Sequence, residues 1–122
     1  MPAQLLFDLN KARTTLKWLK PKLDELQKLG RQLIEAMDNK DLDTADDLSK
    51  QIEGILSKIY KRGVEIKSQD LTLIDFPAVI NGLPAYLCWR YGEKDVEYWH
   101  YLEDGFAGRK PLTGKEEILS PR

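Results

Sequence analysis

Apolar residues recur at alternating intervals of three and four along the N-terminal half of the chain, and this spacing constrains the fold most. The first series is Leu9, Ala12, Leu16, Leu19, Leu23, Leu26, Gly30, Leu33 and Met37. The second series is Ala45, Leu48, Ile52, Ile55 and Ile59. This spacing places all members of a series on one side of an α-helix. The sequence therefore predicts two amphipathic helices.

A polar turn at residues 38–41 separates the two series. Asp41 or Asp43 is a suitable N-cap for the second helix, because a carboxylate can accept a hydrogen bond from a free backbone amide. Gly63 is suited to end that helix. Because a short connection makes neighbouring helices antiparallel, we predict a helical hairpin, coiled-coil-like in its spacing, over about residues 5–62.

The two predicted helices differ in length, at about 45 Å and 30 Å for the standard helical rise. Pro21 lies within the first series. It lacks a backbone donor, so we expect two helical pieces or one bent helix. Further apolar residues flank the seam, namely Trp18, Leu29, Ile34, Leu56 and Tyr60. Either the C-terminal half or a second copy could cover them, and we expect a homodimer formed through the hairpin.

The C-terminal half is dominated by aromatic residues and by signals for strands. Eight of the 11 aromatic residues lie between positions 75 and 109. The pair Asn81-Gly82 is a strong hairpin signal, and residues 92–95 form a second turn. Residues 64–67 alternate apolar and polar side chains, as a half-buried strand does. We therefore predict an α+β fold, in which a small antiparallel β-meander and a glycine-rich loop occupy about residues 64–111.

The two turns predict which residues face one another across the sheet. The first turn pairs Ala78 with Ala85, Phe76 with Leu87, and Asp75 with Cys88. A second turn centred on residues 93–94 pairs Tyr91 with Val96, Arg90 with Glu97, Trp89 with Tyr98, and Leu87 with His100. Paired residues share a face of the sheet, and a slip of one residue in either turn would exchange the faces.

These registers predict one apolar face, which should pack on the helices, and one more polar face. The apolar face carries Phe76, Ala78, Leu87, Trp89, Tyr91, Val96, Tyr98, His100 and Leu102. The polar face carries Asp75, Tyr86, Cys88, Arg90, Glu97, Trp99 and Tyr101. In this arrangement Arg90 lies between Glu97 and Asp75, and His100 lies in the core.

The single histidine and the single cysteine are the residues most suited to catalysis or metal binding. His100 could act as a base or a metal ligand, but a buried structural histidine is the favoured interpretation. The carboxylates near His100 in sequence are Glu97, Glu103 and Asp104, and their spacing matches no known metal site. We therefore expect no metal, no cofactor and no catalytic residue, and Cys88 is expected to be structural.

A loop with two glycines follows the last predicted strand. Gly105 and Gly108 allow a tight turn, and Arg109 comes directly after them. Such a loop could hold an anion, or Arg109 could pair with Asp75, Glu97 or Asp104. The residues that could line a ligand site are Asp75, Arg90, Glu97, His100 and Arg109. Residues 112–122 are polar and are expected to form a loosely ordered tail.

Composition narrows the class of protein. The chain has 122 residues, with 19 basic and 20 acidic side chains. We expect one domain with no nucleic-acid partner, because binding to phosphate backbones needs an excess of basic charge. One cysteine cannot form an internal disulfide, which favours the cytoplasm. No apolar run has the roughly 20 residues that cross a bilayer, so no membrane association is expected.

Four motifs together suggest a family. They are Asp75-Phe76-Pro77, Cys88-Trp89-Arg90, Tyr98-Trp99-His100 and the segment Gly105-Phe106-Ala107-Gly108-Arg109-Lys110-Pro111. In order and spacing, the chain resembles the family catalogued as domain of unknown function 2203, which are small uncharacterised prokaryotic proteins with a helical N-terminal half. The resemblance implies that Asp75, Arg90, His100, Gly105, Gly108 and Arg109 belong to the family motifs, but it implies no activity, cofactor or partner.

Two functions from different classes follow from these observations. The leading interpretation is a non-enzymatic homodimeric scaffold or binding module, whose sheets present a surface to an unknown protein. The alternative is a pocket in the aromatic half that binds a small anionic ligand or performs catalysis. Its basis is a density of ionisable and aromatic side chains greater than a small sheet needs for stability.

Overall fold

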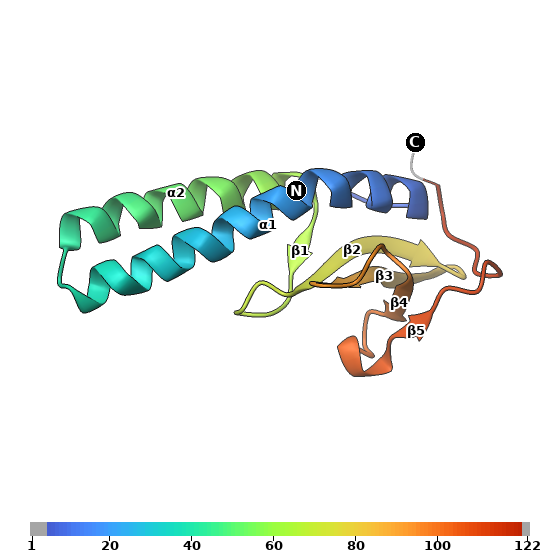
Figure 1. Ribbon diagram of the computed structural model, residues 1–122. Coiled ribbons are helices and arrows are strands. Elements are labelled where there is room, and N and C mark those ends of the chain that lie inside the picture. Colours follow the sequence, from blue (N-terminus) through green and yellow to red (C-terminus); the bar gives the residue numbers. More distant parts are fainter. Residues whose placement is uncertain (1–4, 121–122) are drawn as a thin grey trace.

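The computed structural model describes residues 5–120, in which two long helices precede a five-stranded antiparallel sheet (Figure 1). The elements are α1 (Leu9–Asp38), α2 (Leu42–Lys61), β1 (Glu65–Ile66), β2 (Leu73–Ile80), β3 (Leu83–Arg90), β4 (Tyr98–Tyr101), a 3-10 turn η1 (Phe106–Gly108) and β5 (Lys110–Pro111). The strand order is β1-β2-β3-β4-β5, and every pair is antiparallel. This confirms the predicted helical hairpin followed by a β-meander.

Local side chains determine where both helices begin and end. The Asp8 carboxylate accepts a hydrogen bond from the Lys11 amide at 2.8 Å, and Asp41 caps α2 in the same way. Gly63 follows α2 with φ +86°, a left-handed conformation that glycine adopts without strain. Pro21 lies inside α1, which runs through it as one helix rather than as two pieces. No helix in the described part of the chain is long and apolar enough to cross a membrane.

The register between β2 and β3 is the predicted one. Phe76 pairs with Leu87, and Asp75 pairs with Cys88. The turn between these strands contains Asn81 and Gly82, both with positive φ, as a tight hairpin turn of this kind requires.

The predicted register between β3 and β4 is wrong by one residue. Cys88 pairs with Tyr98 and Tyr86 pairs with His100, whereas the sequence predicted Trp89 with Tyr98 and Leu87 with His100. Because side chains alternate between faces, the slip moves every residue of β4 to the opposite face. His100 therefore does not lie on the apolar face that packs on the helices, and Arg90 does not pair with Glu97.

The slip arises because the connection between β3 and β4 leaves the sheet and packs against α1. The indole nitrogen of Trp89 donates to the Glu93 carbonyl at 3.0 Å. The Arg13 guanidinium donates to the carbonyl of Val96 at 2.9 Å, and Val96 is fully buried. These contacts make residues 91–97 a structured loop instead of a two-residue turn between two longer strands.

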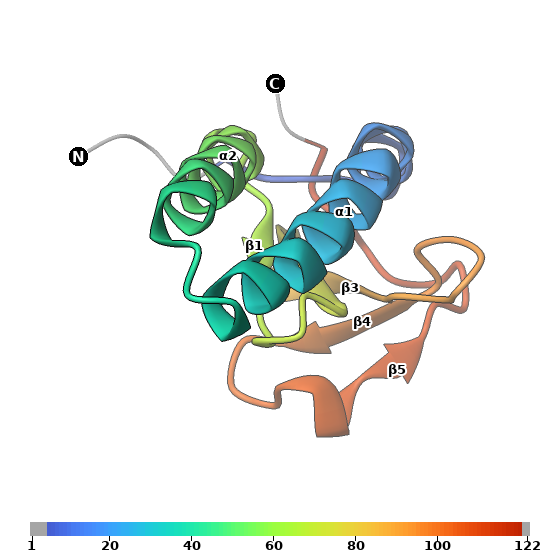
Figure 2. The ribbon, with the colours of Figure 1, turned by 60° about the vertical axis from the view of Figure 1, so that its left-hand side comes forward.

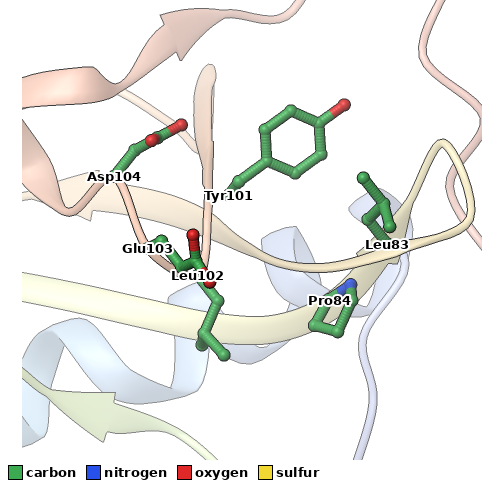
Figure 3. Close-up of a pocket in the computed structure, with 6 residues that line it drawn as sticks. All are labelled: Leu83, Pro84, Tyr101, Leu102, Glu103 and Asp104. Atoms are coloured by element: carbon green, nitrogen blue, oxygen red, sulfur yellow. The ribbon is translucent and has the colours of Figure 1, made fainter.

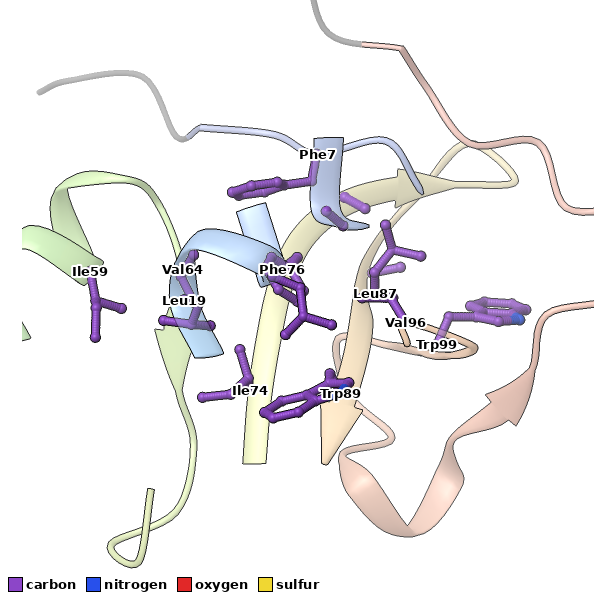
Figure 4. Packing of buried hydrophobic residues seen from close by; sticks show 14 of the residues in the cluster. Phe7, Leu19, Ile59, Val64, Ile74, Phe76, Leu87, Trp89, Val96 and Trp99 are labelled. Atoms are coloured by element: carbon purple, nitrogen blue, oxygen red, sulfur yellow. The ribbon is translucent and has the colours of Figure 1, made fainter. Parts of the chain in front are cut away.

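Both helices cover one face of the sheet, and η1 lies beyond the other face (Figures 1 and 2). The core between the helices and the sheet contains Leu19 and Ile59 from the helices and Phe76, Leu87 and Trp89 from the sheet (Figure 4). We call the face that packs on the helices the inner face and the opposite one the outer face. Trp99 joins the inner face, which the corrected register explains.

The C-terminal segment at residues 112–120 packs against the sheet, so the expectation of a loosely ordered tail is wrong for these residues. The Leu119 amide donates to the Val79 carbonyl at 2.9 Å. Nearby, the Phe7 amide donates to the Pro77 carbonyl at 2.8 Å. Together with β1, these segments occupy the free edge of β2, which would otherwise present unpaired backbone groups to other chains. The last two residues of the predicted tail lie outside the described residues.

Candidate functional site

Three side chains that can bind metals or exchange protons meet on the outer face. Asp75 comes from β2, Cys88 from β3 and His100 from β4. One ligand atom from each residue lies within 4.8 Å of the others. The three residues are 4%, 1% and 2% exposed, respectively. Adjacent antiparallel strands in the observed register therefore build a compact buried cluster from residues far apart in sequence.

Hydrogen bonds fix the orientation of the His100 ring. Its Nδ1 atom lies 2.8 Å from the backbone carbonyl of Tyr101. A carbonyl can only accept, so Nδ1 carries the proton of this bond. The Nε2 atom then faces the Asp75 carboxylate, whose oxygens lie at 3.2 and 3.3 Å. One proton between Nε2 and the carboxylate satisfies both groups, as an imidazolium with a carboxylate or as a neutral pair.

Burial changes the proton affinities of this cluster. Removal from water raises the pKa of Asp75, although His100 acts in the opposite direction. The pKa of the Cys88 thiol is raised to about 12 by burial and by the negative charge of Asp75. Without a bound cation, Cys88 is therefore protonated at neutral pH and is a poor nucleophile.

A pocket of about 230 Å³ opens over the cluster. Asp75, Cys88 and His100 are joined in its lining by Lys67, Leu73, Tyr86, Leu102, Gly105 and Phe106. Polar groups gather along one wall, where the Glu65 carboxylate accepts from Lys67 at 2.7 Å and from the Tyr86 hydroxyl at 3.1 Å. The pocket thus has an ionisable floor, a charged wall and several apolar side chains.

Arg109 supports the cluster from outside the pocket lining. Its guanidinium forms a two-pronged ion pair with the Glu93 carboxylate, in which Nη1 donates to Oε1 at 3.0 Å. It lies 3.9 Å from the ring centre of Tyr98 and 4.6 Å from that of Phe106. Nη1 also lies 3.8 Å from the Cys88 sulfur. Arg109 therefore connects the β3–β4 loop to the glycine-rich loop.

A second pocket, of about 340 Å³, lies beside the start of β3 and the end of β4 (Figure 3). It is lined by Leu83, Pro84, Tyr101, Leu102, Glu103 and Asp104. Its two carboxylates belong to exposed residues, so water screens their charges. This larger pocket lacks the buried ionisable groups that mark the smaller one.

A family comparison matches most of the chain. The sequence model of the family described as "Uncharacterized conserved protein (DUF2203)" matches residues 5–112. The chain belongs to this family. The resemblance inferred from the four motifs is thereby confirmed, and three of those motifs supply Asp75, Cys88 and His100. No curated protein and no solved structure matches the chain.

The structure brings together some of the candidate ligand residues and separates others. Asp75 and His100 form the buried pair, and Arg109 contacts Cys88 at the edge of the same cluster. Arg90 and Glu97 are exposed and do not line the pocket. Arg109 pairs with Glu93 rather than with Asp75, Glu97 or Asp104, so that expectation is corrected.

The glycine-rich loop uses its amides internally. The Gly108 amide donates to the Gly105 carbonyl at 3.2 Å, and the Arg109 amide donates to the Phe106 carbonyl at 3.1 Å. A Cβ atom at position 108 would lie 2.6 Å from the Cβ of Asp104. Gly108 is therefore needed for close packing, and these two amides are not free to bind an anion.

Sequence reasoning missed two residues of the site, Cys88 as a member of the cluster and Glu93 as the partner of Arg109. For Cys88 a signal was available, because the first hairpin register already placed it opposite Asp75. No local signal in the sequence pointed to the pairing of Glu93 with Arg109, since these two residues belong to different loops. The metal expectation considered only carboxylates close to His100 in sequence, and the sheet instead supplies Asp75 from 25 residues away.

Proposed function

We propose that this protein is a non-enzymatic binding module whose outer-face pocket holds a small ligand. The observation that supports this is the buried Asp75–His100 pair at the floor of an open pocket. Burying such groups opposes folding, and apolar residues of similar size would often be at least as stabilising. Asp75 is an ionisable group in a cleft whose pKa is raised by burial, and such a group is a candidate for function rather than for stability.

The lining favours a ligand with one anionic group and a short apolar body. Lys67 is the donor on the charged wall, because its ammonium group has further N–H donors beyond the one given to Glu65. Leu73, Leu102 and Phe106 offer apolar contacts. A volume of about 230 Å³ is below the roughly 300–1,000 Å³ of pockets for drug-sized molecules. Short carboxylic acids have the size and charge that fit this pocket.

Binding can be tested by nuclear magnetic resonance of the isotope-labelled protein. Titration with acetate, propionate and butyrate is expected to shift the backbone amide signals of Cys88, His100 and Phe106, whereas the uncharged propionamide should have a weaker effect. Replacing Leu73 by phenylalanine puts a larger side chain into the pocket. The apparent affinity derived from these shifts should then fall at least about tenfold, because the phenylalanine ring occupies the space of the ligand.

Leu83→Phe is the matched control, since it makes the same change beside the larger pocket. It should leave the carboxylate titration unchanged. The proposal fails if none of the acids shifts the three reporter amides. It also fails if the shifts cluster around Leu83 and Asp104, or if Leu73→Phe binds as well as the natural protein.

A specific observation supports a second role, self-association through the hairpin. Both helices continue past the edge of the sheet (Figure 1). Near the hairpin's free end, Ile34, Met37 and Leu42 are exposed by 63%, 60% and 74%. Clustered exposed apolar side chains are typical of protein–protein interfaces. We propose that this end of the hairpin packs against a second copy of the chain.

Sedimentation equilibrium at micromolar concentration should therefore give the mass of a dimer. Met37→Lys is expected to shift the equilibrium to monomer, because a charged side chain at the interface must lose its water. Leu119→Lys is the control, since Leu119 is an exposed apolar residue in the C-terminal segment. A monomeric natural protein, or equal dissociation by both variants, would contradict the proposed interface.

A further inference from the structure

We propose that Asp75, Cys88 and His100 bind one divalent transition-metal ion of the zinc class, with a fourth coordination position open to the outer-face pocket. This inference deepens the proposed function, on which it rests for the role of the open position. The three protein ligands themselves stand on the geometry of the sheet. They come from three adjacent strands, which hold them more rigidly than loops would.

The distances suit such an ion. With bond lengths of about 2.0–2.1 Å to nitrogen and oxygen, two ligands of a tetrahedral zinc ion lie roughly 3.3 Å apart. The observed distances from His100 Nε2 to the Asp75 oxygens are 3.2 and 3.3 Å. The sulfur of Cys88 is within 4.8 Å of both partners. A zinc–sulfur bond of about 2.3 Å requires a sulfur separation near 3.5 Å, so the Cys88 sulfur must approach its partners by at most about 1.3 Å to complete the site.

The orientation of His100 is that of a metal ligand. Metal-binding histidines almost always donate the proton of the other ring nitrogen to a carbonyl or carboxylate, which fixes the ring. Here Nδ1 donates to the Tyr101 carbonyl, and Nε2 points into the cluster. The ring is almost completely buried, so the surrounding side chains hold it in this orientation.

The chemistry of the three ligands is also compatible with zinc. Imidazole, thiolate and carboxylate are its common protein ligands, and sites with three protein ligands keep a position for water or for a bound molecule. On binding, the Cys88 thiol loses its proton to solvent and its sulfur bonds to the metal. The charges of Asp75 and the thiolate then balance the two positive charges of the ion. A carboxylate in the pocket could occupy the fourth position.

Cobalt(II) provides a direct test, because it replaces zinc and gives a strong absorption when a thiolate is bound. Tag-free full-length protein is treated with a chelator, dialysed and titrated with cobalt(II). We expect one equivalent per chain, a thiolate-to-cobalt charge-transfer band, and loss of both on adding zinc. Cys88→Ala should abolish the band. His100→Gln and Asp75→Asn should each weaken binding by more than the roughly 10–100-fold that loss of an outer contact causes.

Asp104→Asn is the matched control, because it removes an exposed carboxylate of the neighbouring loop, and its titration should equal that of the natural protein. Circular dichroism and the position of the tryptophan emission verify that each variant is folded. A folded natural protein that takes up no cobalt, or binds it without the charge-transfer band, overturns the site. Unchanged affinity in Asp75→Asn overturns the three-ligand arrangement.

The two proposals can fail separately. Carboxylate-induced amide shifts in metal-free protein with no cobalt spectrum would retain the pocket and remove the metal. A cobalt spectrum that carboxylates leave unchanged, with no amide shifts, would retain the metal and remove the small-molecule ligand.

Discussion

Replacing Phe76 by alanine is expected to lower the free energy of unfolding by about 3–5 kcal/mol, the usual effect of truncating a buried phenylalanine. Phe76 is 0% exposed and lies at the centre of the inner face, where its ring contacts Phe7 edge-on with 5.2 Å between ring centres. Truncation leaves a cavity between the helices and the sheet that rigid neighbours fill only in part. Urea denaturation followed by tryptophan fluorescence measures the change.

Phe106→Ala is the matched control, with the same substitution in η1. Phe106 is 38% exposed and rests on the outer side, so we expect a loss of less than about 1 kcal/mol. Equal losses for the two variants would mean that the inner face is not the main core. Because Phe106 lines the pocket, the same variant should also alter the carboxylate titration while leaving the fold intact.

The helices could be predicted because their signals are local. Apolar spacing, Asp41 as a cap and Gly63 as a stop each act within a few residues, and these predictions are confirmed. At Pro21 the local sequence left two outcomes open, two helical pieces or one bent helix, and the structure has one helix. Pro21 is exposed, and the packing of the helix on both sides of it outweighs the missing backbone donor.

One of the two predicted strand registers was correct, because only the first hairpin is specified by local residues. The first hairpin has a turn whose residues specify both its length and its register, so the pairing of Asp75 with Cys88 followed from sequence. The second connection is shaped by contacts with α1 and with Arg109, which the local sequence does not encode. Its one-residue slip moved His100 to the other face.

That slip also explains why the candidate site was only partly predicted. The sequence identified Asp75, His100 and Arg109 as candidates but separated His100 from Asp75 by a whole sheet. With the observed register, the same reasoning places Asp75, Cys88 and His100 together. The information missing from the sequence was the one-residue offset in the β3–β4 register, and it decided whether His100 lay on the inner face or in the cluster on the outer face.

Replacing Arg109 by alanine is expected to lower the free energy of unfolding by about 2–3 kcal/mol, because hydrogen bonds to charged groups contribute about 1.5–3 kcal/mol each. The variant leaves the mostly buried Glu93 carboxylate without its ion pair. It also removes the stacking of the guanidinium on Tyr98 and Phe106. Glu93 keeps the amide of Arg90 as a donor at 2.6 Å, which limits the loss.

The pH dependence of this effect identifies its origin. Burial opposes ionisation of Glu93, but the hydrogen bonds from Arg109 and from the Arg90 amide outweigh it and lower the pKa of Glu93. A group with a lowered folded-state pKa stabilises the fold above its unfolded pKa, and this contribution is lost as the pH falls through the folded-state value. The difference in the free energy of unfolding between the natural protein and Arg109→Ala should therefore be largest at neutral pH and become smaller at acidic pH.

Arg90→Ala is the control for the loss of a positive charge, and it reverses the expectation from sequence. The sequence predicted that Arg90 lies between Glu97 and Asp75, where its loss would leave carboxylates unpaired. In the described residues no carboxylate forms an ion pair with Arg90, and its guanidinium lies 5.9 Å from the ring centre of Phe106. Thermal and urea melts should place Arg90→Ala within about 0.5 kcal/mol of the natural protein, as for most surface substitutions. A larger loss for Arg90→Ala than for Arg109→Ala would restore the predicted register and remove the buried cluster on which the proposed site depends.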